Sequence, residues 1–130
     1  MDDYKYKNVL LVDDSYIDNL INRKIIEKSG FADNIVVIDS PHEAINYMRK
    51  CITEGKNVPE VLFLDIRMPN MSGFEFLKEL NGIEGLPALG IKIYVLSSSL
   101  DPEDLKEIAG NSLVSKFIGK PLTNTVLEEI

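Results

Sequence analysis

The sequence predicts an α/β fold in which five strands and five helices alternate to form a doubly wound parallel sheet. Short β-branched or apolar runs alternate with longer segments of helical period along the chain. Three of the apolar runs are nearly continuous, which is typical of strands covered by helices on both faces. A length of 130 residues with 45% hydrophobic residues suits one compact domain. We therefore expect a single domain over residues 1–130.

The five strands follow from the positions of these runs. They are expected at residues 8–12, 34–38, 61–64, 91–96 and 115–118, of which the first, third and fourth are the nearly continuous apolar runs. Apolar stripes at helical spacing predict the first three helices and the side chains that they bury: Ile17, Leu20, Ile21 and Ile25; Ala44, Ile45, Met48 and Ile52; Phe74, Leu77 and Leu80. Residues 123–130 are just long enough to begin a fifth helix.

Residues at the expected helix ends agree with this order. Gly30 is placed to close the first helix, and Ser40 to cap the second, with Pro41 in its first turn and Glu43 as capping-box partner. Right-handed crossovers then give an open sheet with helices on both sides. A strand order of 2-1-3-4-5 puts the less apolar fifth strand at an edge.

Polar side chains follow four of the predicted strands. Asp13 and Asp14 come after the first strand, Asp65 after the third, Ser97 (followed by two more serines) after the fourth, and Lys120 after the fifth. Because the carboxyl ends of parallel strands meet at one rim of the sheet, where open α/β proteins bind ligands, these groups should converge.

The chemistry of this set favours phosphoryl transfer to an aspartate. Three neighbouring carboxylates repel one another, and a hard divalent cation such as Mg²⁺ (or Mn²⁺), which prefers oxygen ligands and often joins carboxylates to a phosphoryl group, relieves the repulsion. Lys120 can neutralise one phosphoryl oxygen, and the Ser97 hydroxyl can donate to another. A carboxylate can act as the nucleophile.

Composition excludes several classes of partner. A net charge of −7 and a pI near 4.7 argue against direct nucleic-acid binding. The single Cys51 cannot form an internal disulfide, and neither a signal peptide nor a membrane-spanning run is present. We expect a cytoplasmic protein that does not insert into membranes.

Four segments carry a resemblance to a known family. They are LLVDDS at 10–15, LFLDIRMPNMSGFEFL at 62–77, VLSSS at 95–99 and FIGKP at 117–121. In this order and spacing, the chain resembles the CheY-like receiver domains of bacterial two-component response regulators, whose fold is flavodoxin-like. The resemblance covers essentially the whole chain.

The resemblance implies a role for each matching residue. Asp65 is expected to be the phosphoacceptor, and Asp13, Asp14 and Asp65 to hold Mg²⁺ together with the backbone carbonyl of Arg67. In this family the residues at Ser97 and Lys120 contact the phosphoryl oxygens.

The same resemblance implies a conformational switch. The Lys120–Pro121 bond is expected to be cis and to aim the lysine. Phosphorylation is expected to draw Ser97 inward and let Phe117 rotate into the vacated space. The face made by the fourth helix, fifth strand and fifth helix would then bind a downstream partner differently.

A receiver domain of this kind is a signalling module and not an enzyme acting on other substrates. It takes its phosphoryl group from a sensor histidine kinase or a histidine phosphotransfer protein. We expect no output domain in this chain, which is either a stand-alone receiver or a piece of a longer protein. If it stands alone, it would signal by binding a target protein or by relaying the phosphoryl group onward to a histidine phosphotransfer protein.

Two positions differ from the commonest family pattern. Arg67 stands where chemotaxis-type receivers often have Asn, and Ser97 where Thr is commoner. We expect Arg67, whose guanidinium can lie near the phosphoryl group or the attacking water, to alter the lifetime of the phosphoaspartate rather than its formation.

Three other functions compete with this interpretation. A phosphatase of the haloacid-dehalogenase type needs a second aspartate two residues after the nucleophile, where this chain has Arg67. A flavodoxin-like FMN site would meet repulsion between its phosphate and the adjacent Asp13 and Asp14. A receiver-like interaction module that works without phosphorylation remains an alternative.

Overall fold

The computed structural model describes residues 4–98 and 101–130. All five predicted strands are present, each within two residues of its expected bounds: β1 (Tyr6–Val12), β2 (Ala32–Ile38), β3 (Val61–Asp65), β4 (Lys92–Ser97) and β5 (Val114–Gly119). The helices between and after them are α1 (Tyr16–Ser29), α2 (Pro41–Glu54), α3 (Gly73–Asn81), α4 (Pro102–Ala109) and α5 (Asn124–Glu129). A short 3₁₀ helix, η1 (Pro87–Leu89), which the sequence did not predict, precedes β4.

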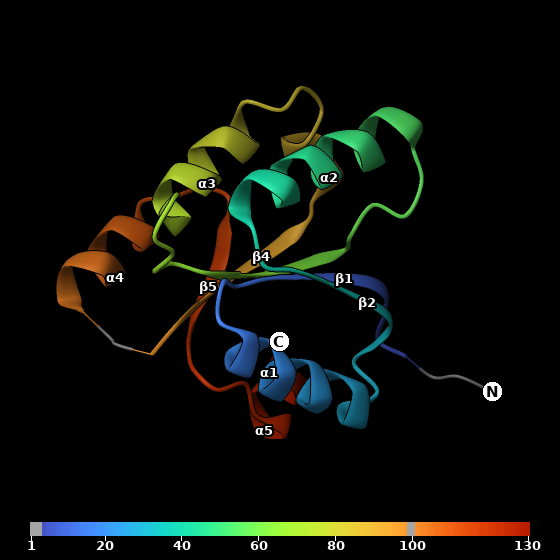
Figure 1. Ribbon diagram of the computed structural model, residues 1–130, viewed down its shortest axis with the longest axis vertical. Helices are drawn as coiled ribbons and strands as arrows, with labels where there is room; N and C mark the ends of the chain where they lie inside the picture. Colours follow the sequence, from blue (N-terminus) through green and yellow to red (C-terminus); the bar gives the residue numbers. More distant parts are fainter. Residues whose placement is uncertain (1–3, 99–100) are drawn as a thin grey trace.

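The strands pair in parallel in the order β2-β1-β3-β4-β5. This is the predicted order, and it leaves β5 at an edge. Helices α2, α3 and α4 cover one face of the sheet, while α1 and α5 cover the other (Figure 1). The predicted doubly wound α/β fold is confirmed.

Two hydrophobic cores lie on the two faces of the sheet. Successive side chains of a strand point to opposite faces, so Leu10 packs in the same core as Met48 of α2, while Leu11 packs in the same core as Ile26 of α1. Nearly all of β3 and β4 is buried in this way, and so is the second half of β1, residues 9–12. The continuous apolar runs in the sequence are explained by helices on both faces.

The helix ends largely follow the predicted signals. Gly30 ends α1 with a φ of 69°, in the left-handed region that glycine adopts without strain. The Ser40 hydroxyl accepts the Glu43 N–H at the start of α2, with a proline in the first turn. The reciprocal bond of the predicted capping box, from the Ser40 N–H to the Glu43 side chain, is not made between these two described residues. Among the described residues, Ser72 and Glu75 at the start of α3 make both bonds of a capping box.

The predicted apolar face of α1 is wrong. Ile17, Leu20 and Ile21 are 65%, 43% and 42% exposed, and the fully buried apolar side chain of this helix is Ile26. The stripe expected to cover the sheet therefore faces solvent for most of its length, and Ile25 alone of its members is partly buried.

Two buried asparagines explain how α1 is turned. The Asn19 amide donates to the backbone carbonyl of Asp13 at 2.7 Å, and the Leu122 N–H donates to Asn22 Oδ1 at 3.0 Å. These bonds satisfy backbone groups in the loops after β1 and β5, which would otherwise be buried without partners. The helix therefore presents its asparagine face to the protein.

Within the part of the chain that is described, no helix combines the length and apolar character needed to cross a bilayer.

Candidate functional site

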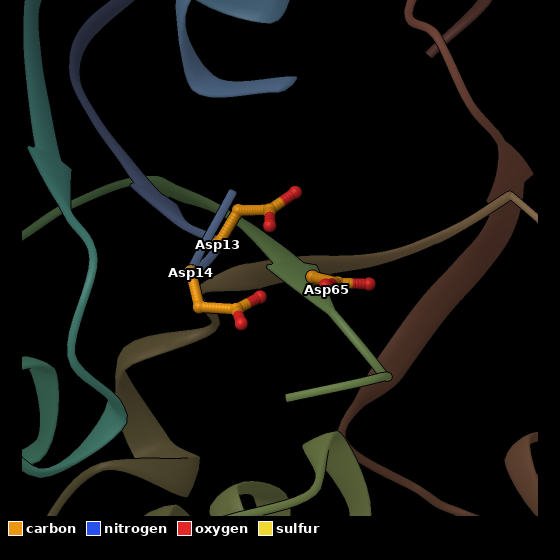
Figure 2. Close-up of side chains that lie close together, drawn as sticks. All are labelled: Asp13, Asp14 and Asp65. Atoms are coloured by element: carbon orange, nitrogen blue, oxygen red, sulfur yellow. The ribbon is translucent and has the colours of Figure 1, made fainter. Parts of the chain in front are cut away.

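Three carboxylates meet where β1 and β3 end. Asp13 and Asp14 directly follow β1, and Asp65 is the last residue of β3, hydrogen-bonded in the sheet beside it. Figure 2 shows their side chains gathered at this edge, and one oxygen of each lies within 4.8 Å of those of the other two. The convergence that the parallel topology predicted is present. We call Asp13, Asp14, Asp65, Ser97 and Lys120 the strand-end site.

The three carboxylates differ in exposure. Asp13 and Asp65 are buried, at 0% and 4% exposure, whereas Asp14 is exposed. Backbone donors hold the two buried groups: the Ser15 N–H lies 2.9 Å from Asp13 Oδ1, and the Arg67 N–H lies 3.2 Å from Asp65 Oδ1. The site therefore has a fixed inner pair of acids and one acid that faces solvent.

The Lys120 ammonium lies among the carboxylates. Its Nζ is 2.7 Å from Asp13 Oδ2, 2.8 Å from Asp18 Oδ2 and 3.4 Å from Asp65 Oδ1, and its side chain is 9% exposed. The Lys120 N–H also donates to the Ser97 carbonyl at 2.8 Å. The peptide bond between Lys120 and the following proline is cis, as expected.

Burial and charge perturb both the acceptor and the lysine. Burial, and next the charge of Asp13, raise the pKa of Asp65 to about 6, although Lys120 and the Arg67 N–H act in the opposite direction. Burial alone lowers the pKa of Lys120, but hydrogen bonds to Asp13 and Asp18 outweigh it and hold that pKa above its ordinary value. The lysine therefore stays charged, and Asp65 ionises at a cost that a cation can remove.

The two expected switch residues lie on neighbouring strands. Ser97 ends β4 and is 1% exposed, and Phe117 lies on β5 opposite Val95. Phe117 is partly buried against the core under α2, α3 and α4. Of the serines after β4, Ser99 lies outside the described residues.

The loop after Asp65 turns back tightly on the strand. The Gly73 N–H donates to the Ile66 carbonyl at 2.9 Å, and a Cβ on Gly73 would lie 2.6 Å from the Ile66 Cα. Only glycine fits this approach. The glycine of the second motif-bearing segment, residues 62–77, therefore lets α3 begin directly beside the acceptor strand.

The Arg67 guanidinium is engaged by α4. It forms an ion pair with Asp104 in the first turns of that helix and lies 3.8 Å from Asp101, the helix N-cap. Asp104 is buried although charged. The interpretation of Arg67 as a residue beside the phosphoryl group did not include this partner.

Four residues near the site were not singled out from the sequence. Asp18, Asn19 and Asn22 lie on α1, and Asp104 lies on α4. Asp18 and Asn19 precede Asn22 by about one helical turn. These three polar residues stand among the isoleucine and leucine residues of the segment 17–22, which is a signal for a buried polar face. Asp104 gives no local signal, because its partner is 37 residues away.

Comparison with protein families identifies this arrangement. The family model of the response regulator receiver domain matches residues 9–130. The chain belongs to this family. Receiver domains are signalling modules of two-component systems, and phosphorylation on an aspartate is typical of them.

Two relatives of this receiver domain are named as regulators. The chain is 30% identical over 115 residues to the probable methanogenesis regulatory protein FilR2 of Methanothrix harundinacea, covering 88% of this chain and 72% of that protein. It is 27% identical to the two-component response regulator ORR1 of Oryza sativa, of which it spans 52%. The second relative is thus about twice as long as the matched region.

Solved structures share the fold closely. A two-component response regulator from Cytophaga hutchinsonii superposes with a TM-score of 0.87 at 30% identity, covering 95% of this chain and 92% of that one. The receiver domain of the histidine kinase CKI1 from Arabidopsis thaliana, determined in complex with Mg²⁺, has a TM-score of 0.79 at 24% identity, covering 95% and 90%. Receiver domains thus occur in both kinases and regulators.

Proposed function

We propose that this receiver domain accepts a phosphoryl group on Asp65 in a Mg²⁺-dependent reaction. The observation that carries the proposal is the buried Asp65 carboxylate, which lies within 4.8 Å of two further carboxylates and 3.4 Å from the Lys120 ammonium. Such a set combines a nucleophile with the charges that phosphoryl transfer requires.

The donor atoms fit a hard divalent cation. Asp13, Asp14 and Asp65 would hold Mg²⁺ or Mn²⁺ with their carboxylates, and Arg67 would add its backbone carbonyl. The raised pKa of Asp65 has burial and Asp13 as its main causes, so the site is poised to gain from added positive charge. When bound, the cation offsets the charge on the phosphoryl oxygens during transfer.

The transfer itself uses this chain's own side chains. An Asp65 carboxylate oxygen attacks phosphorus, and the bond from phosphorus to the donor breaks with its electron pair left on the donor. Lys120 neutralises one phosphoryl oxygen, and the Ser97 hydroxyl donates to another. Attack of water on the phosphoaspartate later releases inorganic phosphate and restores the carboxylate.

We further propose a histidine-based phosphodonor, namely a sensor histidine kinase or a histidine phosphotransfer protein. The output would be the face made by α4, β5 and α5, which carries the partly buried Phe117. The chain would promote its own phosphorylation and dephosphorylation and no reaction of an external substrate.

Intact-mass analysis after incubation with acetyl phosphate tests the acceptor and the metal together. We expect a gain of one phosphoryl group in Mg²⁺ and none in EDTA, because the acid cluster needs a counter-charge. Asp65→Asn should show no gain. Asp33→Asn removes an exposed acid from β2 and should behave as wild type.

Two results would argue against the proposal. Labelling of Asp65→Asn would place the acceptor elsewhere. A wild-type protein that neither gains mass nor binds beryllofluoride, a phosphoryl mimic, in Mg²⁺ would favour the module that interacts without phosphorylation.

A further inference from the structure

The Lys120 ammonium has a third anionic neighbour that does not come from a strand end. Asp18 lies in the first turn of α1 and places its Oδ2 2.8 Å from Lys120 Nζ, as close as Asp13 and closer than Asp65. Together the three carboxylates match the three N–H donors of an ammonium group. The two strand-end acids also belong to the candidate metal cluster, and Asp18 does not.

The absence of Asp18 from the metal cluster matters once a cation and a phosphoryl group occupy the site. A cation held by Asp13 and Asp65 takes over much of their negative charge, and a phosphoryl group on Asp65 adds a new acceptor for the ammonium. Asp18 then remains the one carboxylate among the three that is committed to Lys120 alone. The longest contact, to Asp65 at 3.4 Å, is the one that a phosphoryl oxygen can most readily replace.

Hydrogen bonds of α1 before and after Asp18 hold this residue close to Lys120. The Asp18 N–H donates to the Ser15 hydroxyl, the N-cap of α1, at 3.2 Å. One turn further on, Asn22 accepts the N–H of Leu122, two residues after the lysine. The helix that carries the carboxylate is thereby bonded to the loop that carries the ammonium.

We propose that Asp18 is a positioning residue, which holds the Lys120 ammonium beside Asp65 while a cation and a phosphoryl group engage the strand-end acids. The proposal rests on the proposed phosphoacceptor function of Asp65. It adds α1 to the elements that build the reaction site, and it predicts that transfer is slower when the Asp18 charge is lost.

An Asp18→Asn variant tests this role, because it keeps the shape of the side chain and removes its charge. The rate of phosphorylation is measured against acetyl phosphate concentration in Mg²⁺. We expect the maximal rate to fall about tenfold, in the range seen when a partner that orients a functional group is removed. Asp18→Glu, which keeps the charge, should recover part of the rate.

A second readout follows the lysine directly. Acetic anhydride modifies accessible amines, and peptide mass mapping gives the labelling of Lys120 relative to the exposed Lys116 of β5, the strand that ends just before Lys120. We expect this ratio to rise severalfold in Asp18→Asn, because the substitution removes the carboxylate that lies 2.8 Å from Lys120 Nζ and helps to hold the ammonium in its buried position. The thermal midpoint of each variant shows whether the fold is intact.

Glu27→Gln is the matched control. It removes a carboxylate from the same helix that is exposed and paired only with Arg23. This variant should keep the wild-type rate and labelling ratio. Wild-type values of both quantities in Asp18→Asn would overturn the proposal. If wild-type protein takes up no phosphoryl group, the proposed function fails, and an unchanged labelling ratio would then overturn the contact between Asp18 and Lys120 as well.

Discussion

At the scale of single residues, the acceptor carboxylate is held in a place that is unfavourable for its charge. Asp65 is 4% exposed and lies beside the fully buried Asp13, and these two facts raise its pKa to about 6 from an ordinary value of 3.8. Lys120 relieves only part of this repulsion. In the absence of a cation, the charge on Asp65 therefore lowers the stability of the folded protein near neutral pH.

Asp65→Asn should accordingly stabilise the metal-free protein at pH 7, by on the order of 1 kcal/mol. Because the folded pKa exceeds the unfolded one, the folded state binds more protons between them, and this group's contribution to stability improves as the pH falls from 7 towards 4. The advantage of the variant should therefore shrink at pH 5. Urea unfolding in EDTA at both pH values measures it.

Asp33→Asn serves again as control, since it removes an exposed carboxylate of β2. It should give the same difference from wild type at both pH values. An advantage of Asp65→Asn that does not change with pH would contradict the raised pKa.

At the scale of secondary-structure elements, α1 shows that a helix can place its polar side inward. Asn19 and Asn22 are buried and bond to backbone groups of the loops that carry Asp13 and Lys120. An unsatisfied buried backbone group costs roughly 1–3 kcal/mol, which is comparable to the gain from burying one isoleucine. The free energy gained by satisfying the backbone groups of two loops is therefore comparable to the free energy that burial of the apolar stripe would gain.

A matched pair of substitutions on α1 checks this orientation. Ile17 is 65% exposed and Ile26 is 0% exposed. Ile17→Ala should change the free energy of unfolding by no more than about 0.5 kcal/mol, and Ile26→Ala should lower it by about 2–5 kcal/mol because it leaves a cavity. Equal losses in chemical denaturation would mean that the helix is turned as the apolar stripe predicts.

At the scale of the whole molecule, an ion pair joins the loop after Asp65 to α4. Arg67 lies two residues after Asp65, and its guanidinium pairs with Asp104 of α4. The Asp104 side chain is 12% exposed, so removal of the arginine leaves a mostly buried carboxylate. The pair also links the reaction site to one of the three elements of the proposed output face.

Arg67→Asn should therefore lower the free energy of unfolding by about 1 kcal/mol, discounted because the arginine itself is exposed. Arg49→Asn breaks a pair with Glu79 in which both side chains are about half exposed, and should cost less than about 0.5 kcal/mol. Urea unfolding compares the two.

The same variants address the lifetime of the phosphoaspartate. We expect Arg67→Asn to change the rate at which the phosphorylated protein loses its phosphoryl group, measured by intact mass after removal of acetyl phosphate, and Arg49→Asn to leave it unchanged. An unaltered rate in Arg67→Asn would remove Arg67 from the control of dephosphorylation.

Much of the site was predictable because it follows from the order of the strands. The apolar runs locate the strands, parallel pairing brings their carboxyl ends to one edge, and Asp13, Asp65 and Lys120 meet there as a consequence. The roles of Ser97 and Phe117 stay predictions. Caps such as Ser40 and Gly30 were predictable for a similar reason, because their signals lie within a few residues of the helix ends.

The sequence by itself determined the fold, the edge at which the reactive groups gather and the chemistry that those groups favour. Only the tertiary structure decided which partners each charged side chain takes: Asp18 for Lys120, and Asp104 for Arg67. The physical reason is that backbone pairing positions the strand ends, and the apolar pattern that locates each strand is visible within a few residues of sequence. The rotation of a helix about its axis depends instead on every contact that the helix makes with the rest of the molecule.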